Sequence, residues 1–168
     1  ISAILSDTVI FKSNTTTTTD IEMADKLNKI AEIEDLQKFG IEMKKKKSSL
    51  AGLTPEQIIY SDFKIFEAND KKFGIGQIET VDLSEAEKIE INLLNKINEI
   101  AEKEGLNFII LMLTDIINEG SKLLISSGAN CLKKTFDKEI IDNSVYLEKM
   151  MSQKKDLVPL ILKSLEDK

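Results

Sequence analysis

The chain has 168 residues, 42% of them apolar and 31% charged, which is the composition of a folded domain with a buried core and not of a disordered chain. The formal net charge of −6 argues against general nucleic-acid binding, because such binding depends on many lysines and arginines on one face. The absence of histidine excludes histidine-based acid–base catalysis and histidine metal ligation within this chain.

The single cysteine, Cys131, excludes an intramolecular disulfide and every metal motif built from several cysteines. A lone cysteine also fits a reducing compartment. No apolar run approaches the roughly 18 residues that a membrane-spanning helix needs. We therefore expect a cytoplasmic protein that binds neither nucleic acid nor a membrane.

The N-terminal part of the chain predicts a buried element, a linker and two helices. Residues 1–11 are mostly apolar and are typical of the end of a buried element, and the threonine-rich stretch 12–19 predicts a linker. Thr19 and Glu22 have the spacing of a capping box at a helix start. A second helix is expected to end in the solvated basic run 44–47, where positive charge is favourable. Because the chain begins in mid-pattern and without methionine, we expect it to be part of a longer protein.

The middle of the chain predicts a helix, a hairpin and a longer helix. Residues 54–57, Thr-Pro-Glu-Gln, combine a capping threonine with proline at the first helical position. Two strand-like segments with turn residues between them then predict a β-hairpin. The expected elements from here on are strands at 62–67 and 72–80, a helix from a capping box at Ser84 and Glu87 to Gly105, strands within 107–114, 122–126 and 144–151, and a helix near 131–136.

The strand expected at 107–114 is apolar throughout its middle, which is typical of a strand covered on both faces. Strands and helices are intermixed around it. The sequence therefore predicts an α/β (α+β) sandwich with a mixed sheet of about five strands flanked by helices.

The segment Ser152-Gln153-Lys154-Lys155 places two lysines behind a helix-capping serine. The N-terminus of a helix favours anions, and lysines are slightly unfavourable there unless an anion is bound. The segment therefore predicts a local phosphate site in a chain that is acidic overall.

Four stretches in chain order resemble one known family. They are residues 74–82 (GIGQIETVD), 113–120 (LTDIINEG) and 152–155 (SQKK), preceded by 2–8 (SAILSDT) with 11–13 (FKS). Together they resemble the C-terminal DHHA2 domain of the manganese-dependent (family II) inorganic pyrophosphatases, members of the DHH phosphoesterase superfamily. By this resemblance residues 1–19 are the end of the catalytic DHH domain plus a linker, and 20–168 are the DHHA2 domain.

The resemblance implies an enzyme that hydrolyses pyrophosphate to two phosphates between its two domains. It implies that manganese is held mostly by an N-terminal DHH domain, which this chain lacks, and that the C-terminal domain supplies basic groups to the substrate. We accordingly expect this piece alone to carry no catalytic residue, to bind no manganese and to be inactive. Its partners are then the substrate and the missing domain, and the surface left exposed predicts association into a homo-oligomer.

The resemblance also implies roles for four residues. Asp7 matches the family's last metal-binding aspartate, and Lys64 and Lys154 match substrate-binding lysines. Gln153 stands where the family has arginine, so it offers substrate an amide hydrogen bond without charge. Asp115, by contrast, is expected to have only a structural role in a loop.

Two other functions stay open. Gln153 is compatible with an exopolyphosphatase-like DHH phosphoesterase that acts on longer polyphosphate. The chain as it stands, without a metal-binding domain, is compatible with a non-catalytic module that binds phosphate or a partner protein.

Overall fold

The computed structural model describes residues 1–47, 50, 52–132 and 135–166, and it divides into two compact units, Ile1–Ser49 and Leu50–Lys168. In that described part of the chain, no helix is long and apolar enough to cross a membrane. The assignment of 1–19 and 20–168 to two different domains remains a prediction.

The first unit consists of the helices α1 (Ser2–Asp7), α2 (Thr18–Ala31) and α3 (Leu36–Lys47). The predicted capping box at Thr19 and Glu22 is wrong. Thr17 caps α2 instead: its hydroxyl accepts a hydrogen bond from the backbone nitrogen of Asp20 at 3.3 Å, and the Asp20 carboxylate accepts one from the Thr17 nitrogen at 2.8 Å. The last two threonines of the expected linker therefore belong to α2.

The basic run at the end of α3 is not uniformly solvated, contrary to the prediction. Lys44 is only 3% exposed, and its ammonium group donates a 3.0 Å hydrogen bond to the backbone carbonyl of Ser6 at the end of α1. Carbonyl groups in the last turn of a helix lack helical partners, so a lysine from a neighbouring helix can satisfy them. Lys45 and Lys46 are exposed as expected.

A left-handed backbone segment follows α1. Val9, Ile10 and Phe11 have φ angles of 50°, 58° and 64°, a region that β-branched residues rarely adopt. The Thr8 hydroxyl accepts a hydrogen bond from the Phe11 nitrogen at 3.1 Å, and Val9 and Ile10 are buried. Gly40 on α3 makes room for Ile10, because a Cβ there would lie 2.9 Å from the isoleucine side chain. Burial thus compensates for an unfavourable backbone conformation.

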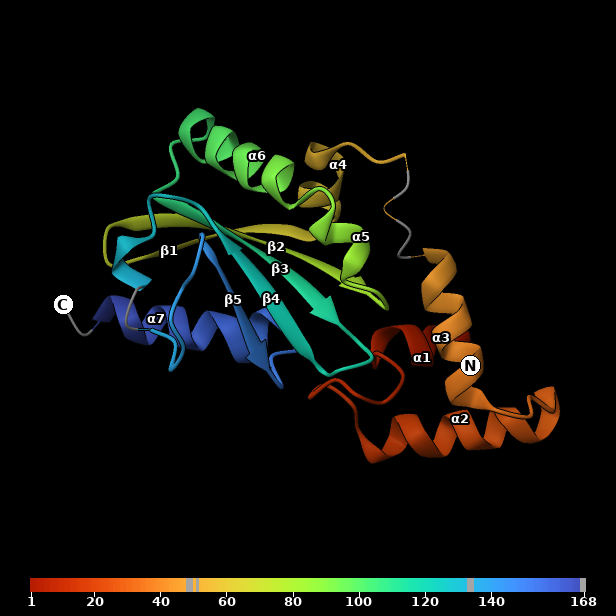
Figure 1. Cartoon of the computed structure of the whole chain (residues 1–168). Coiled ribbons are helices and arrows are strands. Elements are labelled where there is room, and N and C mark those ends of the chain that lie inside the picture. Colours follow the sequence, from red (N-terminus) through yellow and green to blue (C-terminus); the bar gives the residue numbers. More distant parts are fainter. Residues whose placement is uncertain (48–49, 51, 133–134, 167–168) are drawn as a thin grey trace. The chain divides into compact units, whose positions relative to one another are not determined.

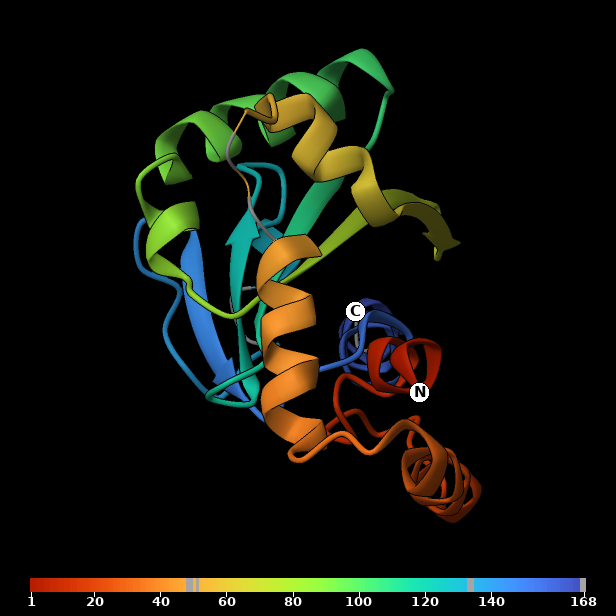
Figure 2. The ribbon, with the colours of Figure 1, turned by 90° about the vertical axis from the view of Figure 1, so that its right-hand side faces the viewer.

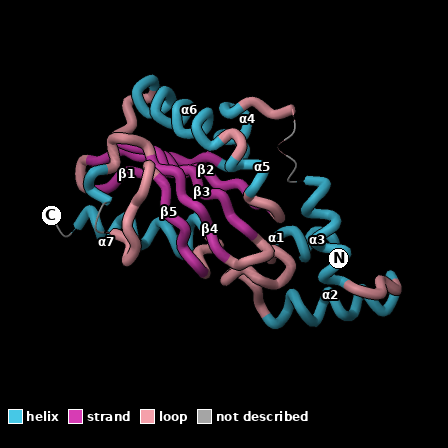
Figure 3. The backbone as a smooth tube through the Cα atoms, viewed as in Figure 1, coloured by secondary structure: helices cyan, strands magenta, loops and turns pink. Residues whose placement is uncertain are grey.

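The second unit is built on a mixed sheet in which five strands follow one another in chain order, which confirms the predicted fold class (Figures 1 and 3). Strands β2 and β3 are parallel, and every other neighbouring pair is antiparallel. The strands are β1 (Phe63–Ala68), β2 (Lys71–Thr80), β3 (Phe108–Asp115), β4 (Gly120–Ile125) and β5 (Ser144–Glu148).

Helices cover both faces of this sheet. The helices α4 (Pro55–Ile59) and α6 (Glu90–Lys103) lie over one face, and α7 (Val158–Glu166) lies over the other (Figures 1 and 2). All eight residues of β3 are buried, and its side chains alternate between two hydrophobic clusters. Ile109, Leu111 and Leu113 pack with α4 and α6, whereas Phe108, Ile110 and Met112 pack with α7.

The two predicted capping boxes in this unit have different outcomes. At Thr54 the capping box is present: the threonine hydroxyl accepts from the Gln57 nitrogen at 3.2 Å, and the Gln57 side chain accepts from the Thr54 nitrogen at 2.9 Å. The box predicted at Ser84 and Glu87 is absent, because Ser84 is the first residue of a short helix, α5 (Ser84–Glu87), and Leu83 occupies the capping position. The expected long helix is therefore interrupted before α6 begins.

The hairpin prediction is confirmed. Strands β1 and β2 pair antiparallel, and Asn69 and Asp70 form the turn with φ angles of 47° and 59°. The helix expected near 131–136 is a short 3₁₀ turn, Asn130–Leu132, and residues 133 and 134 lie outside the described part.

Candidate functional site

The chain that leads into the predicted phosphate-binding segment is fixed to the sheet by buried polar groups. The Ser121 hydroxyl of β4 donates a 2.6 Å hydrogen bond to the Met150 carbonyl and lies 3.0 Å from the Thr114 hydroxyl of β3. The Gln77 amide of β2 donates to the Met151 carbonyl at 3.0 Å and to the Thr114 hydroxyl at 2.9 Å. Three central strands therefore hold the backbone just before Ser152.

Ser152 caps the helical segment that follows, as predicted. Its hydroxyl accepts a 3.2 Å hydrogen bond from the Lys155 nitrogen. The first turn, Gln153–Leu157, is π-helical and leads directly into α7. The Asp156 carboxylate accepts hydrogen bonds from the backbone nitrogens of Met151 and Ser152 at 2.9 and 2.8 Å, which ties this turn back to the preceding chain.

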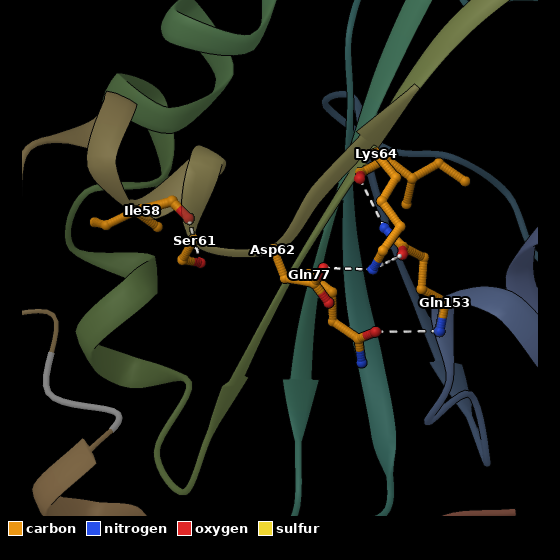
Figure 4. Close-up of polar contacts among 7 residues, drawn as sticks. Ile58, Ser61, Asp62, Lys64, Gln77 and Gln153 are labelled. Atoms are coloured by element: carbon orange, nitrogen blue, oxygen red, sulfur yellow. Dashed lines mark hydrogen bonds and ion pairs between the residues drawn. The ribbon is translucent and has the colours of Figure 1, made fainter. Parts of the chain in front are cut away.

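Gln153 points into the protein. Its residue is 2% exposed, its amide nitrogen donates a 2.7 Å hydrogen bond to the Ile75 carbonyl, and its amide oxygen accepts one from the Lys64 ammonium at 3.0 Å (Figure 4). Its backbone nitrogen donates to the Gln77 side-chain oxygen at 3.1 Å. A glutamine that precedes two lysines in the sequence thus joins β1 and β2 to the π-helical turn before α7.

Lys64 of β1 reaches this turn from the edge of the sheet. Besides Gln153, its ammonium contacts the Asp62 carboxylate, which lies two residues earlier in the chain (Figure 4). Asp62 is the last residue of the 3₁₀ turn Tyr60–Asp62, which directly precedes β1, so this ion pair joins the turn to the strand.

Lys154 and Lys155 lie on the outer side of the same turn and are exposed. The backbone nitrogens of Gln153 and Lys155 are already used by Gln77 and Ser152. An anion at this helix start would therefore depend mainly on lysine ammonium groups, and less on main-chain N–H donors than the sequence suggested. The structure brings Lys64 and Gln153 into contact and places Lys154 next to Gln153 in the chain.

Asp7 lies in the first unit, at the C-terminal end of α1, and is exposed. Within the described residues, no three histidine, cysteine, aspartate or glutamate side chains gather in a way that could hold a metal ion. Manganese needs several oxygen or nitrogen ligands, so one exposed carboxylate does not fit a complete site. A complete manganese centre that includes Asp7 therefore needs ligands from outside the described residues.

Sequence reasoning missed Gln77, although it lies in the quoted stretch 74–82. The signal available was a glutamine inside the apolar middle of a strand, and only the structure shows that it bonds with Met151 and Gln153. Asp115 has the loop role expected for it: its carboxylate accepts hydrogen bonds from the backbone nitrogens of Ile117 and Asn118 at 2.9 and 3.0 Å.

Comparison with known proteins shows which sequences this chain is similar to. The chain is 46% identical to a manganese-dependent inorganic pyrophosphatase of Methanocaldococcus jannaschii, over 95% of this chain and 52% of that protein. It is 43% identical to a manganese-dependent inorganic pyrophosphatase of Methanothrix thermoacetophila, over 94% of this chain and 51% of that protein.

A crystal structure of a Methanococcus jannaschii candidate family II inorganic pyrophosphatase matches the fold with a TM-score of 0.86 and 44% identity, over 98% of this chain and 53% of the other. The chain thus spans about half the length of the relatives that it matches. The model of the DHHA2 domain matches residues 41–164. With a matching domain model and a matching fold, the chain belongs to the DHHA2 domain family.

Proposed function

We propose that this chain is the substrate-binding part of a manganese-dependent inorganic pyrophosphatase that hydrolyses pyrophosphate to two phosphates. The observation that carries this proposal is the contact between Lys64 and Gln153 at the π-helical turn that leads into α7. The chain is similar to such enzymes along most of its length. In this proposal Lys64 and Lys154 contact the phosphate groups, and Asp7 contributes one carboxylate to a manganese site completed by an N-terminal DHH domain.

The chemistry of the lysines supports this assignment. Pyrophosphate and its hydrolysis products carry several negative charges, and ammonium groups placed beside the phosphate oxygens lower the energy of the charge that develops during phosphoryl transfer. In this chain the lysines bind and orient the substrate, and the buried hydrogen bonds around Gln77 and Ser121 hold the turn on which Lys154 stands. The single cysteine fits a cytoplasmic location for the enzyme.

A fusion protein tests the proposal. The N-terminal half of the Methanocaldococcus jannaschii enzyme, which this chain does not match, is joined ahead of the 168-residue chain, and release of phosphate from pyrophosphate is measured with manganese. We expect hydrolysis by the fusion and none by either half alone. A folded fusion that leaves pyrophosphate intact would contradict the proposal.

The same fusion separates the alternatives. An exopolyphosphatase-like enzyme would turn over tripolyphosphate faster than pyrophosphate, whereas the proposed enzyme prefers pyrophosphate. A non-catalytic module would bind phosphate in the isolated chain and give an inactive fusion.

A further inference from the structure

Lys64 is held by two acceptors of different charge. Its ammonium group donates to the amide oxygen of Gln153 at 3.0 Å and forms an ion pair with the carboxylate of Asp62 (Figure 4). An ammonium group has three N–H donors, so these two contacts leave one direction for a further acceptor. The amide leaves the lysine charge intact, whereas the carboxylate neutralises it.

The side chain of Gln153 is fixed by bonds that do not involve Lys64. Its amide nitrogen donates to the Ile75 carbonyl at 2.7 Å, and its residue is 2% exposed. A carbonyl only accepts hydrogen bonds, so the amide nitrogen must face Ile75 and the amide oxygen must face Lys64. Gln77 holds the backbone of the same residue at 3.1 Å. The acceptor for Lys64 is therefore held in place by buried hydrogen bonds.

Asp62 holds Lys64 less firmly. The Asp62 side chain is 51% exposed and the Lys64 side chain 38%, and ion pairs at such exposure contribute little because water and salt screen them. A phosphate carries more negative charge than a carboxylate. It can therefore replace Asp62 at the ammonium group while the contact with Gln153 persists.

We propose that Gln153 is a positioning residue that keeps the Lys64 ammonium directed at a bound phosphate, and that Asp62 is the counter-ion which this phosphate displaces. The inference rests on the proposed function, in which Lys64 binds pyrophosphate. A lysine side chain loses conformational entropy when a ligand immobilises it, and Gln153 imposes most of that restriction before the ligand arrives. Asp62 in turn weakens binding, because each phosphate must displace the Asp62 carboxylate from the Lys64 ammonium.

Titration of the 168-residue chain with pyrophosphate, without metal and followed by NMR chemical shifts, tests this division of roles. For Asp62→Asn we expect the Kd to fall by roughly two- to fivefold, because the competing charge is lost from an exposed position. For Gln153→Glu we expect the Kd to rise by about tenfold, because a second carboxylate of nearly the same shape then neutralises Lys64. Gln153→Met removes the acceptor and should also raise the Kd by about tenfold.

Glu67→Gln is the matched control for Asp62→Asn. Glu67 lies on the same strand, on the opposite face from Lys64, and its neutralisation makes the same change in net charge. Its Kd should equal that of the unchanged chain. Urea unfolding of each variant shows which proteins are folded, and if Gln153→Met does not fold, Asp62→Asn and Gln153→Glu still decide the question.

The outcomes separate this inference from the function on which it rests. If Lys64→Met weakens binding but Asp62→Asn behaves like Glu67→Gln, or Gln153→Glu binds like the unchanged chain, the inference is overturned and the proposed function stands. If Lys64→Met binds pyrophosphate as well as the unchanged chain, both fail. In the fusion protein, a positioning role predicts a changed KM with an unchanged kcat, which a loss of folded protein would not produce.

Discussion

The side-chain oxygen of Gln77 accepts a 3.1 Å hydrogen bond from the backbone nitrogen of Gln153, a residue 76 positions further along the chain. The amide nitrogen of Gln77 donates to the Met151 carbonyl and the Thr114 hydroxyl. One side chain of β2 thus fixes the π-helical turn before α7, and with it the backbone of Lys154 and Lys155.

Replacement of Gln77 should therefore reduce both stability and order at this turn. Gln77→Leu leaves the Met151 carbonyl and the Gln153 nitrogen without their Gln77 partner, and the Thr114 hydroxyl keeps only its contact with Ser121. We expect the free energy of unfolding in urea to fall by roughly 1–3 kcal/mol. Gln77→Glu keeps the acceptor for the Gln153 nitrogen, but an ionised carboxylate has no donor. Its loss in the free energy of unfolding should therefore be smaller at low pH, where the carboxyl is protonated and can donate a hydrogen bond. A change below about 0.5 kcal/mol in Gln77→Leu would show that the contact is not needed.

Lys154→Met should raise the KM of the fusion protein for pyrophosphate, because one ammonium group of the proposed phosphate site, on the residue that follows Gln153, is lost. Lys103→Met is the matched control: it removes the same charge from an exposed position at the end of α6. We expect the KM for pyrophosphate to rise by roughly tenfold in Lys154→Met and to stay unchanged in Lys103→Met. Equal effects in both would indicate only a response to net charge.

A pair of helix-start variants tests the capping boxes predicted at Thr54 and Ser84. Thr54→Ala removes the observed capping box of α4 and should cost about 1 kcal/mol in the free energy of unfolding. Ser84→Ala changes a residue that caps nothing, so its effect should lie within about 0.5 kcal/mol. Denaturation with urea measures both, and a larger cost at Ser84 would contradict the structure.

Two glycines distinguish steric clash from backbone strain. A Cβ at Gly128 would lie 2.0 Å from the Asn107 carbonyl oxygen, so Gly128→Ala should cost about 3 kcal/mol or fail to fold. Gly105 has a φ of +64° but open space around its Cβ position, so Gly105→Ala should cost only about 1 kcal/mol. Thermal unfolding of the two variants gives the order, and the reverse order would refute this account.

The ionisation of Tyr60 should change stability at high pH. Partial burial, and then its hydrogen bond to the Glu104 carboxylate, raise the pKa of Tyr60 from 10.0 to about 12. The pKa of Tyr60 in the folded state lies above its pKa in the unfolded chain. The stability that the protonated Tyr60 contributes is therefore complete below pH 10 and disappears as the pH rises towards 12.

Tyr60→Phe should accordingly lose less stability than the unchanged chain over this pH interval. Urea midpoints measured at both ends of the interval check this. In Tyr60→Phe the remaining tyrosine is Tyr146, so the phenolate absorbance of this variant gives the reference titration for that of the unchanged chain. Burial raises the pKa of Tyr146 as well. Parallel losses of stability in the two proteins would contradict the assignment.

The fold was predictable where one pattern admitted one structure. The continuous apolar run of β3 indicated a strand covered on both faces, and all its residues are buried. The turn residues Asn69 and Asp70 indicated the hairpin. Thr54 and Gln57 could cap in only one register because proline marks the first helical position.

The predictions failed where several helix registers were possible, or where a residue's partner lies far away in the sequence. Any of the consecutive threonines at 15–19 can cap a helix, and hydrogen bonding to Asp20 selects Thr17. Lys44 is a lysine in a basic run, which locally suggests exposure, yet a carbonyl 38 residues away accepts its hydrogen bond. Gln153 is buried for the same kind of reason, since its partners Lys64, Ile75 and Gln77 come from β1 and β2.

The position of Lys64 on β1 has a consequence for the behaviour of the protein in concentrated solution. Strand β1 is the first in the sheet and pairs only with β2 among the residues that the structure describes, so its outer edge could recruit a strand from another molecule. Lys64 and Glu67 put charge on either side of the exposed Ile65. Charged side chains on an edge strand oppose such intermolecular β-sheet growth, so the ammonium group that we assign to phosphate would also protect the protein against aggregation.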